Sequence, residues 1–259
     1  MDLRSVAFIF DLDGCVYTGN DLVPGVERCL AVIRARRQPV LFLTNNSREA
    51  GDELLEKLTR LDIQATAHEI LSAAEVTGPF VREQFGPSKV LAIGSDRLRR
   101  MIQAAGHTIL SPQEFTQAEV VVVGHDFAFD YEKLAALARG IWGGAAFVAV
   151  NRDPRLPVEG GEFLPGCGAM VAAVSAATGA TPILIGKPEP HTFRAALARL
   201  QVPPDKAVMV GDTLDSDVRG GQRAGLRTIW LAPKGATADD PQPDLTIHHF
   251  DELTELLMK

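Results

Sequence analysis

Short apolar runs alternate with amphipathic stretches along most of this 259-residue chain. The runs are rich in Val, Ile, Leu and Phe, as in strands that are buried on both faces of a sheet. We expect strands at Val6–Phe10, Val40–Leu43, Val90–Ile93, Val120–Val123, Ala146–Val150, Ile183–Ile185, Ala207–Val210 and Thr228–Leu231. Apolar residues recur at helical spacing in Ala50–Leu61 and His191–Leu200. Strands that alternate with helices predict an α/β fold with parallel sheets.

Composition and charge exclude several classes of function. Lys and Arg number 26 and Asp and Glu number 33, for a net charge of −7 without a long basic run. Binding to a nucleic-acid backbone is therefore not expected. No apolar stretch is long enough to span a bilayer, so we expect no membrane segment. We see no signal peptide, and the three cysteines have unrelated spacings, so we expect a cytoplasmic protein without a disulfide framework or a zinc site.

The first candidate for chemistry follows the first apolar run. Asp11 and Asp13 end this run and Gly14 comes next. Side chains two residues apart on a strand point the same way, so extended geometry would bring the two carboxylates together. Such a pair suits a divalent metal and acid/base chemistry. An acidic turn made by Asp and Gly is the alternative reading of the same residues.

Two further strand ends carry polar residues. Thr44, Asn45 and Asn46 follow the second run, where a hydroxyl and free amide groups suit a phosphate, although N-capping of the next helix is the better explanation of this motif taken alone. Lys187 follows another run and precedes a Pro-x-Pro turn. A lysine fixed in that way is a compact cation for a phosphoryl oxygen or a carboxylate, whereas most lysines lie on the surface.

The last motif is acidic. Asp212 directly follows the run Ala207–Val210 and Gly211, and Asp215 and Asp217 come within five residues. Oxygen ligands suit a hard cation such as Mg²⁺, and we expect Asp212 to be a direct ligand. Asp217 is better placed to support the metal or to bind Lys187, and Asp215 is expected to be solvated. The helix macrodipole also favours acidic residues at a helix start.

Taken together, the four motifs predict phosphoryl transfer. Ligands bind at the carboxyl ends of the strands in open α/β sheets, and each motif lies at a strand end. Carboxylates, a metal, a hydroxyl and a lysine supply the charge neutralisation and positioning that this reaction needs. The motifs fall in 11–47 and 187–217, which suggests a core of 1–85 and 182–259 interrupted by an inserted α/β domain of 86–181.

These motifs, Asp11-Leu-Asp13-Gly14, Thr44-Asn45-Asn46, Gly186-Lys187-Pro188 and Gly211-Asp212 with Asp217, resemble those of the haloacid dehalogenase-like phosphohydrolase superfamily. The middle of the chain, with Val123-Gly124-His125-Asp126, Asn151-Arg152-Asp153-Pro154 and Pro165-Gly166-Cys167-Gly168, resembles the large-capped subgroup of NagD, nitrophenylphosphatase and phosphoglycolate phosphatase-like proteins. Cys15 departs from the aliphatic residue or threonine of many relatives. The resemblance implies a doubly wound, Rossmann-like parallel-sheet core with the inserted cap.

The resemblance also implies residue roles. Asp11 would form an aspartyl-phosphate and Asp13 would act as general acid and base. Mg²⁺ would bind Asp11, the Asp13 carbonyl and Asp212. The phosphoryl oxygens would be held by Thr44, Asn45, Asn46 and Lys187, with Asp217 in support.

In the cap, Asn151, Arg152 and Asp153 would belong to a substrate-specificity loop, and a homodimer would form through this domain. The expected function is Mg²⁺-dependent hydrolysis of a small-molecule phosphomonoester. A non-catalytic phosphate-ligand-binding protein and a phosphotransferase or phosphomutase are the alternatives. His248 and His249 could contact a metal, although a surface turn is the simpler reading.

Overall fold

The computed structural model of the protein describes residues 3–157 and 162–259, and it contains two compact units. The first unit comprises Met1–Thr44, Gly51–Leu71 and Lys187–Lys259, and the second comprises Asn45–Ala50 and Ser72–Gly186. The second unit therefore begins earlier along the chain than residue 86, where the predicted insertion starts. Its assignment as a cap remains a prediction.

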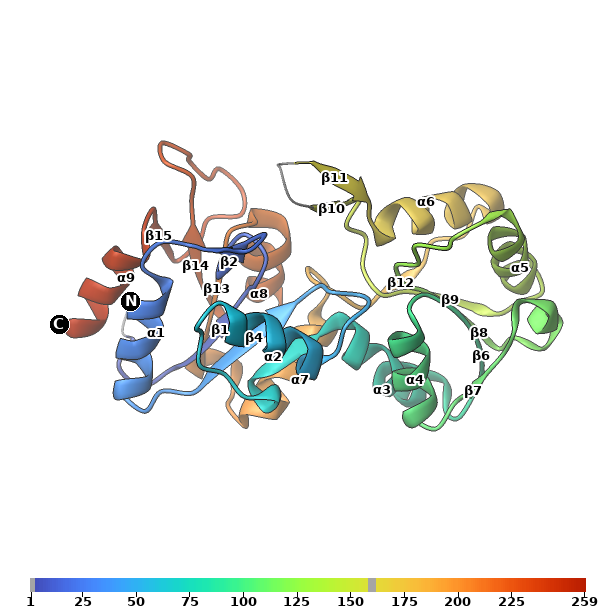
Figure 1. Ribbon diagram of the computed structural model, residues 1–259, viewed down its shortest axis with the longest axis horizontal. Helices are drawn as coiled ribbons and strands as arrows, with labels where there is room; N and C mark the ends of the chain where they lie inside the picture. The colour runs from blue at the N-terminus through green and yellow to red at the C-terminus, as the bar shows by residue number, and fades with distance from the viewer. Residues whose placement is uncertain (1–2, 158–161) are drawn as a thin grey trace. The chain divides into compact units, whose positions relative to one another are not determined.

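A six-stranded sheet forms the centre of the first unit, in the order β15-β14-β13-β1-β4-β5, and its strands from β15 to β4 are parallel (Figure 1). Its strands are β1 (Ala7–Phe10), β4 (Val40–Thr44), β5 (Ile70–Ser72), β13 (Ala207–Gly211), β14 (Arg227–Leu231) and β15 (Leu245–Ile247). From β1 the chain continues to β4 and β5 on one side, whereas β13, β14 and β15 are added on the other. The order therefore reverses between β1 and β13, and this is the position at which doubly wound sheets bind ligands.

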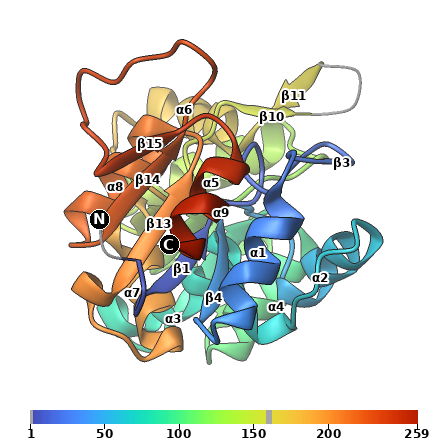
Figure 2. The same ribbon diagram turned by 90° about the vertical axis from the view of Figure 1, so that its left-hand side faces the viewer.

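Helices cover both faces of this sheet. They are α1 (Val26–Ala35), α2 (Gly51–Arg60), α7 (Pro190–Leu200), α8 (Gly220–Arg223) and α9 (Phe250–Met258). Phe8 and Phe10 project from β1 into one core, which also receives apolar residues of α1, α2 and α9. Figure 2 shows α1 and α9 side by side on that face. Met209 of β13 pairs with Ile9 of β1. It packs under α8 on the other face of the sheet.

The second unit has its own parallel sheet, in the order β12-β9-β8-β6-β7. Its strands are β6 (Lys89–Ile93), β7 (Thr108–Ile109), β8 (Val120–Val123), β9 (Ala146–Ala149) and β12 (Ile183–Leu184). Its helices are α3 (Ala73–Phe85), α4 (Asp96–Ala104), α5 (Tyr131–Trp142) and α6 (Cys167–Thr178). Residues of α5 and α6 pack against β6, β8 and β9 in a separate core.

The predicted strands and helices are confirmed, with ends that differ by at most one residue. Strands β5, β7 and β15 were missed because two or three residues are too few to show a pattern, and all three lie at edges of their sheets. Two short hairpins were also missed, β2 (Tyr17–Thr18) with β3 (Asp21–Leu22) and β10 (Arg155–Pro157) with β11 (Phe163–Pro165). Within 3–157 and 162–259, no helix combines the length and the apolar character needed to span a bilayer.

A substitution of Phe250, at the start of α9, tests how this helix packs against β1. It is fully buried, and its ring lies 6.2 Å from the ring of Phe10. We expect Phe250→Ala to lower the free energy of unfolding by about 3–5 kcal/mol, because it removes a large ring and leaves a cavity. Urea unfolding measures the change. On the same helix, the 56% exposed Met258 provides the control, because Met258→Ala should change stability by less than about 0.5 kcal/mol. Equal effects of the two substitutions would contradict this packing.

Candidate active site

The site residues of the first unit gather because parallel strands end at the same edge of the sheet. Asp11 directly follows β1 and Asp212 directly follows β13, and these two strands are neighbours. The backbone N–H of Asp11 continues the ladder and donates to the carbonyl of Val210 at 2.9 Å. Thr44 is the buried last residue of β4, on the other side of β1. Three of the predicted motifs therefore share one edge.

Lys187 joins two of the acidic side chains. Its Nζ donates to Oδ1 of Asp11 at 2.6 Å and to Oδ1 of Asp217 at 2.7 Å. All three side chains are almost completely buried, with at most 11% of any of them exposed. Asp212 lies in the same cluster, because one carboxylate oxygen from each of Asp11, Asp212 and Asp217 falls within 4.8 Å of the others. The ammonium of Lys187 thus lies against two of three clustered carboxylates.

Burial is the largest influence on the pKa values of these groups, and the charges of their neighbours come second. Burial raises the pKa of Asp11 well above its ordinary value, and the ammonium of Lys187 offsets only part of this effect. Burial and the carboxylate of Asp217 raise the pKa of Asp212 to about 6. Burial by itself lowers the pKa of Lys187, but the carboxylates of Asp11 and Asp217 outweigh it and hold that pKa above its ordinary value. Additional positive charge would stabilise the ionised forms of Asp11 and Asp212, the two carboxyls whose pKa values are raised.

Two glycines allow the carboxylates to approach the backbone. Gly14 has a φ of +90°, and a Cβ on it would lie 2.4 Å from Oδ2 of Asp212. A Cβ on Gly211 would lie 2.3 Å from Cγ of Asp217. Any larger residue at either position would displace a carboxylate of the cluster. The sharp turn that the sequence predicted at Gly14 thus also makes room for Asp212.

The position of Asp13 differs from the expectation that its carboxylate would lie beside that of Asp11. The extended geometry that would bring its carboxylate to that of Asp11 does not persist, because β1 ends at Phe10. The chain turns there, with the carbonyl of Leu12 accepting from the N–H of Val16 at 2.9 Å. The Asp13 side chain is 58% exposed, whereas that of Asp11 is buried. A role for the Asp13 carbonyl as a metal ligand remains a prediction.

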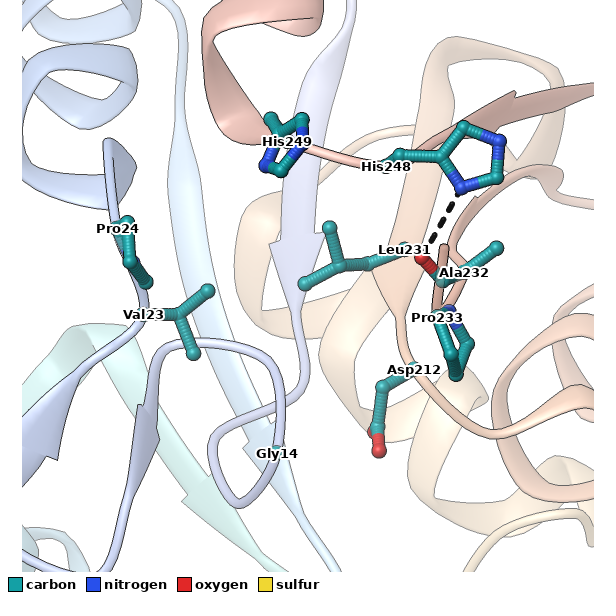
Figure 3. A pocket seen from close by; sticks show the side chains of 9 residues that line it. All are labelled: Gly14, Val23, Pro24, Asp212, Leu231, Ala232, Pro233, His248 and His249. Atoms are coloured by element: carbon teal, nitrogen blue, oxygen red, sulfur yellow. Dashed lines mark hydrogen bonds between the residues drawn. The ribbon is translucent and has the colours of Figure 1, made fainter. Parts of the chain in front are cut away.

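Asp212 also borders a cavity of about 260 Å³ in the first unit. Figure 3 shows its carboxylate beside Gly14, with apolar side chains and the two histidines His248 and His249 around the rest of the cavity. Nδ1 of His248 lies 3.2 Å from the carbonyl oxygen of Ala232. Among the described residues, neither histidine belongs to a cluster of metal-ligating groups. This arrangement fits the surface-turn reading better than metal binding.

Two residues that sequence reasoning missed lie beside the predicted aspartates. The indole N–H of Trp230 donates to the backbone carbonyl of Asp212 at 2.8 Å and so holds that residue in place. Nζ of Lys57 lies 4.0 Å from Oδ1 of Asp13 and 3.7 Å from the ring centroid of Tyr17. Neither Trp230 nor Lys57 stands in a recognisable motif, since β14 and α2 bring them to the site only in the folded chain.

The remaining predicted residues lie in the second unit. Nδ2 of Asn151 donates to the carbonyl of Asn45 at 2.6 Å, and Oδ1 of Asn151 accepts from the N–H of Asp153 at 3.0 Å. Nδ2 of Asn45 in turn lies 3.4 Å from Oδ1 of Asp153. Arg152, between them, is exposed. The structure therefore brings Asn45 against the predicted specificity loop, which the sequence had placed in different domains.

Asn46 does not cap α2, which begins at Gly51, but hydrogen-bonds to residues just after it. Its Oδ1 accepts from the N–H groups of Arg48 at 2.8 Å and Glu49 at 2.9 Å, and its Nδ2 donates to the Glu49 carboxylate. These bonds form a local turn before α2. The proposed contact of Asn46 with phosphate is still a prediction.

The acidic cluster fits a hard divalent cation. Three carboxylates offer oxygen atoms within 4.8 Å of one another, and such oxygens are the ligands that Mg²⁺ prefers. The ammonium of Lys187 contacts only two of the three carboxylates, and it offsets only part of the effect that raises the pKa of Asp11. Asp215 is not part of this cluster; its side chain is 52% exposed and pairs with Arg219 at 3.0 Å, in line with the solvated position predicted for it.

The raised pKa of Asp212 predicts how stability depends on pH when no cation is bound. A group with a folded pKa of about 6 against an ordinary 3.8 binds its proton more tightly in the folded chain. The stabilisation that this proton gives to the folded chain is therefore fully present below about pH 4. It is lost as the pH rises through 6, which lowers the free energy of unfolding by at most about 3 kcal/mol. Asp212→Asn should remove this part of the loss in urea unfolding measured in EDTA between pH 4 and pH 7. The exposed Asp215→Asn should retain it, and identical profiles for the two variants would refute the assignment.

Comparison with known proteins agrees with this geometry. Residues 8–108 match the family described as haloacid dehalogenase-like hydrolase, and residues 184–255 match the family described as HAD-hydrolase-like. An acid sugar phosphatase of Staphylococcus aureus is 35% identical over 236 residues, which are 91% of this chain and 90% of that protein.

Solved structures of similar proteins cover nearly the whole chain. The p-nitrophenyl phosphatase of Archaeoglobus fulgidus has a TM-score of 0.86 at 26% identity, over 97% of this chain and 99% of that one. The 4-nitrophenylphosphatase of Thermotoga maritima has a TM-score of 0.87 at 27% identity, over 98% of both chains. The resemblance found in the sequence is confirmed: the chain belongs to the haloacid dehalogenase-like hydrolase family and is a phosphomonoester hydrolase.

Proposed function

We propose that the protein is a Mg²⁺-dependent phosphatase that hydrolyses a small-molecule phosphomonoester through an aspartyl-phosphate on Asp11. The observation that carries this proposal is the bridge that Lys187 forms between Asp11 and Asp217, beside Asp212 at the reversal point of the sheet. A nucleophile, a cation and a candidate metal site therefore lie within one cluster. Phosphoryl transfer depends on positioning and on charge neutralisation of this kind.

Asp11 is suited to the role of nucleophile by the way its two oxygens are held. Oδ1 accepts from Nζ of Lys187, and no other described group hydrogen-bonds to this carboxylate. Oδ2 is thus left for attack on phosphorus. The attack forms the bond between Oδ2 and phosphorus and breaks the bond from phosphorus to the alcohol oxygen. Lys187 also favours the ionised carboxylate, which is the reactive form.

Asp13 would manage the protons of both steps. Its carboxyl is 58% exposed and can therefore reach a leaving alcohol and a water molecule. In the first step it donates a proton to the departing alkoxide. In the second step it takes a proton from the water that attacks phosphorus, so that Asp11 and inorganic phosphate are released. The same residue thus serves first as a general acid and then as a general base.

Lys187 and Thr44 would hold the transferring group, Lys187 by its charge and Thr44 by its hydroxyl at the end of β4. The carboxylates of Asp11 and Asp212, with the carbonyl of Asp13, would bind Mg²⁺, and Asp217 would keep Lys187 in place. Mg²⁺ supplies positive charge that neutralises the phosphoryl oxygens. A contact of Asn45 with phosphate and a cytoplasmic location complete the proposal.

Sugar phosphates are the substrate class that we place first. The curated relatives at 34–35% identity are named acid sugar phosphatases, and they cover 90% or more of this chain. Asn151, Arg152 and Asp153 are the proposed specificity residues, because Asn151 and Asp153 form a hydrogen-bonded loop with Asn45 and leave Arg152 exposed. An exposed arginine can bind a second anionic group or a hydroxyl of the substrate. A homodimer through the second unit remains a prediction.

The decisive variant is Asp11→Asn, which removes the nucleophile and conserves the shape of the side chain. We expect it to lower turnover by at least about 10³-fold, because the covalent route is lost. The measurement is phosphate release from a panel of sugar phosphates and other metabolite esters, with Mg²⁺ and with EDTA. Asp215→Asn is the matched control, since Asp215 is exposed and ion-paired to Arg219, and it should retain wild-type activity.

Three results would argue against the proposal. Mg²⁺-dependent hydrolysis retained in Asp11→Asn would exclude Asp11 as the nucleophile. Phosphorylated acceptor formed without free phosphate would indicate a phosphotransferase or phosphomutase. Tight binding of phosphate esters with no product after long incubation would indicate a non-catalytic binding protein.

A further inference from the structure

A second cavity of the first unit lies at the opposite end of the catalytic strands. It has a volume of about 280 Å³ and is lined by residues next to the amino ends of β1, β4 and β13, among them Ala7, Pro39 and Lys206. Asp11, Thr44 and Asp212 follow or end the same three strands at their carboxyl ends. A strand of four or five residues is roughly 13–17 Å long, so the cavity is separate from the catalytic cluster.

Four cations line this basic cavity: Arg4, Arg36, Arg37 and Lys206. Arg36 donates to the carbonyl of Leu257, which occupies one of its five N–H groups. Arg37 and Lys206 are exposed, and no described residue forms an ion pair with either side chain. In a chain with a net charge of −7, the grouping of Arg36, Arg37 and Lys206 around one small cavity forms a local positive field. Their mutual repulsion would be relieved by a bound anion.

The backbone fixes the cavity wall. Arg37 has a φ of +57° and closes the carboxyl end of α1, in the left-handed position that glycine usually takes. Gln38, directly after it, is buried and donates through Nε2 to the carbonyls of Leu3 at 2.7 Å and Val6 at 3.1 Å. These two bonds attach the segment before β1 to the end of α1. Arg37 is therefore presented from a wall that is already ordered, which reduces the cost of binding.

We propose that the basic cavity binds a compact anion with two phosphoryl groups, such as inorganic pyrophosphate or a small bisphosphate, at a site distinct from the catalytic one. Guanidinium groups bind phosphate oxygens in bidentate fashion, and the ammonium of Lys206 adds a point charge. The guanidinium groups of Arg36 and Arg37 and the ammonium of Lys206 together exceed the charge that a single phosphate needs. The small volume, about 280 Å³, favours a ligand in which the charge is concentrated. Binding here does not require catalysis at Asp11.

Isothermal titration with inorganic pyrophosphate tests the proposal on the full-length protein, in EDTA and at about 0.15 M ionic strength. We expect wild type to bind pyrophosphate and Arg37→Gln with Lys206→Gln to weaken binding at least about tenfold, because two charged contacts are lost. Lys187→Met removes the buried cation of the catalytic cluster and should leave this binding intact. The double variant Arg60→Gln and Arg194→Gln removes two exposed cations that do not line the cavity and should also bind as wild type does.

Arg37→Gly provides a second variant that keeps the fold. Glycine is favoured at a φ of +57°, so this substitution removes the guanidinium without straining the turn. It should weaken pyrophosphate binding even if the double variant Arg37→Gln with Lys206→Gln folds poorly. The proposal is wrong if wild type binds pyrophosphate more weakly than about 1 mM, or if Arg37→Gly binds as wild type does. It is also wrong if Lys187→Met alone abolishes binding, or if Arg60→Gln with Arg194→Gln weakens it equally.

Discussion

The ammonium of Lys187, held between Asp11 and Asp217, is the interaction on which the rest of the site depends. Both bonds are at hydrogen-bond distance and almost entirely shielded from water. Burying charges costs several kcal/mol per ion, so this arrangement persists only because each charge has a partner close by. The balance remains incomplete, since Asp212 adds a third carboxylate and its pKa is raised to about 6. The site is therefore built with a shortage of positive charge, which a divalent cation can supply.

The strand order explains how distant parts of the chain form this cluster. Asp11 and Asp212 are about two hundred residues apart, yet they follow the neighbouring strands β1 and β13. Buried apolar residues fix the register of those strands. The contact between the rings of Phe10 and Phe250 packs β1 against α9. Gly14 and Gly211 then leave room for two carboxylates to lie close to the backbone. Packing in the core thus sets the distances between groups that are costly to hold together.

The sequence predicted the elements and the strand-end motifs because both depend on local patterns. It anticipated the contact of Asp217 with Lys187, but not the other contacts around the site. The exposed position of Asp13 depends on the turn at Leu12, shortly after β1 ends at Phe10. A pattern with a period of two residues does not reveal where a strand ends. Trp230 and Lys57 carry no motif, and only the tertiary fold brings them to Asp212 and Asp13. Likewise, the bond between Asn151 and Asn45 joins segments that no local signal relates.

The most direct test of the central claim is to find the covalent intermediate. The protein would be mixed with p-nitrophenyl phosphate and Mg²⁺, quenched in acid within the first turnover, and digested for mass spectrometry. The account predicts one phosphoryl group, and it predicts this group on the peptide that contains Asp11. A phosphoryl group on any other residue, or full turnover without phosphorylated protein at any quench time, would contradict it.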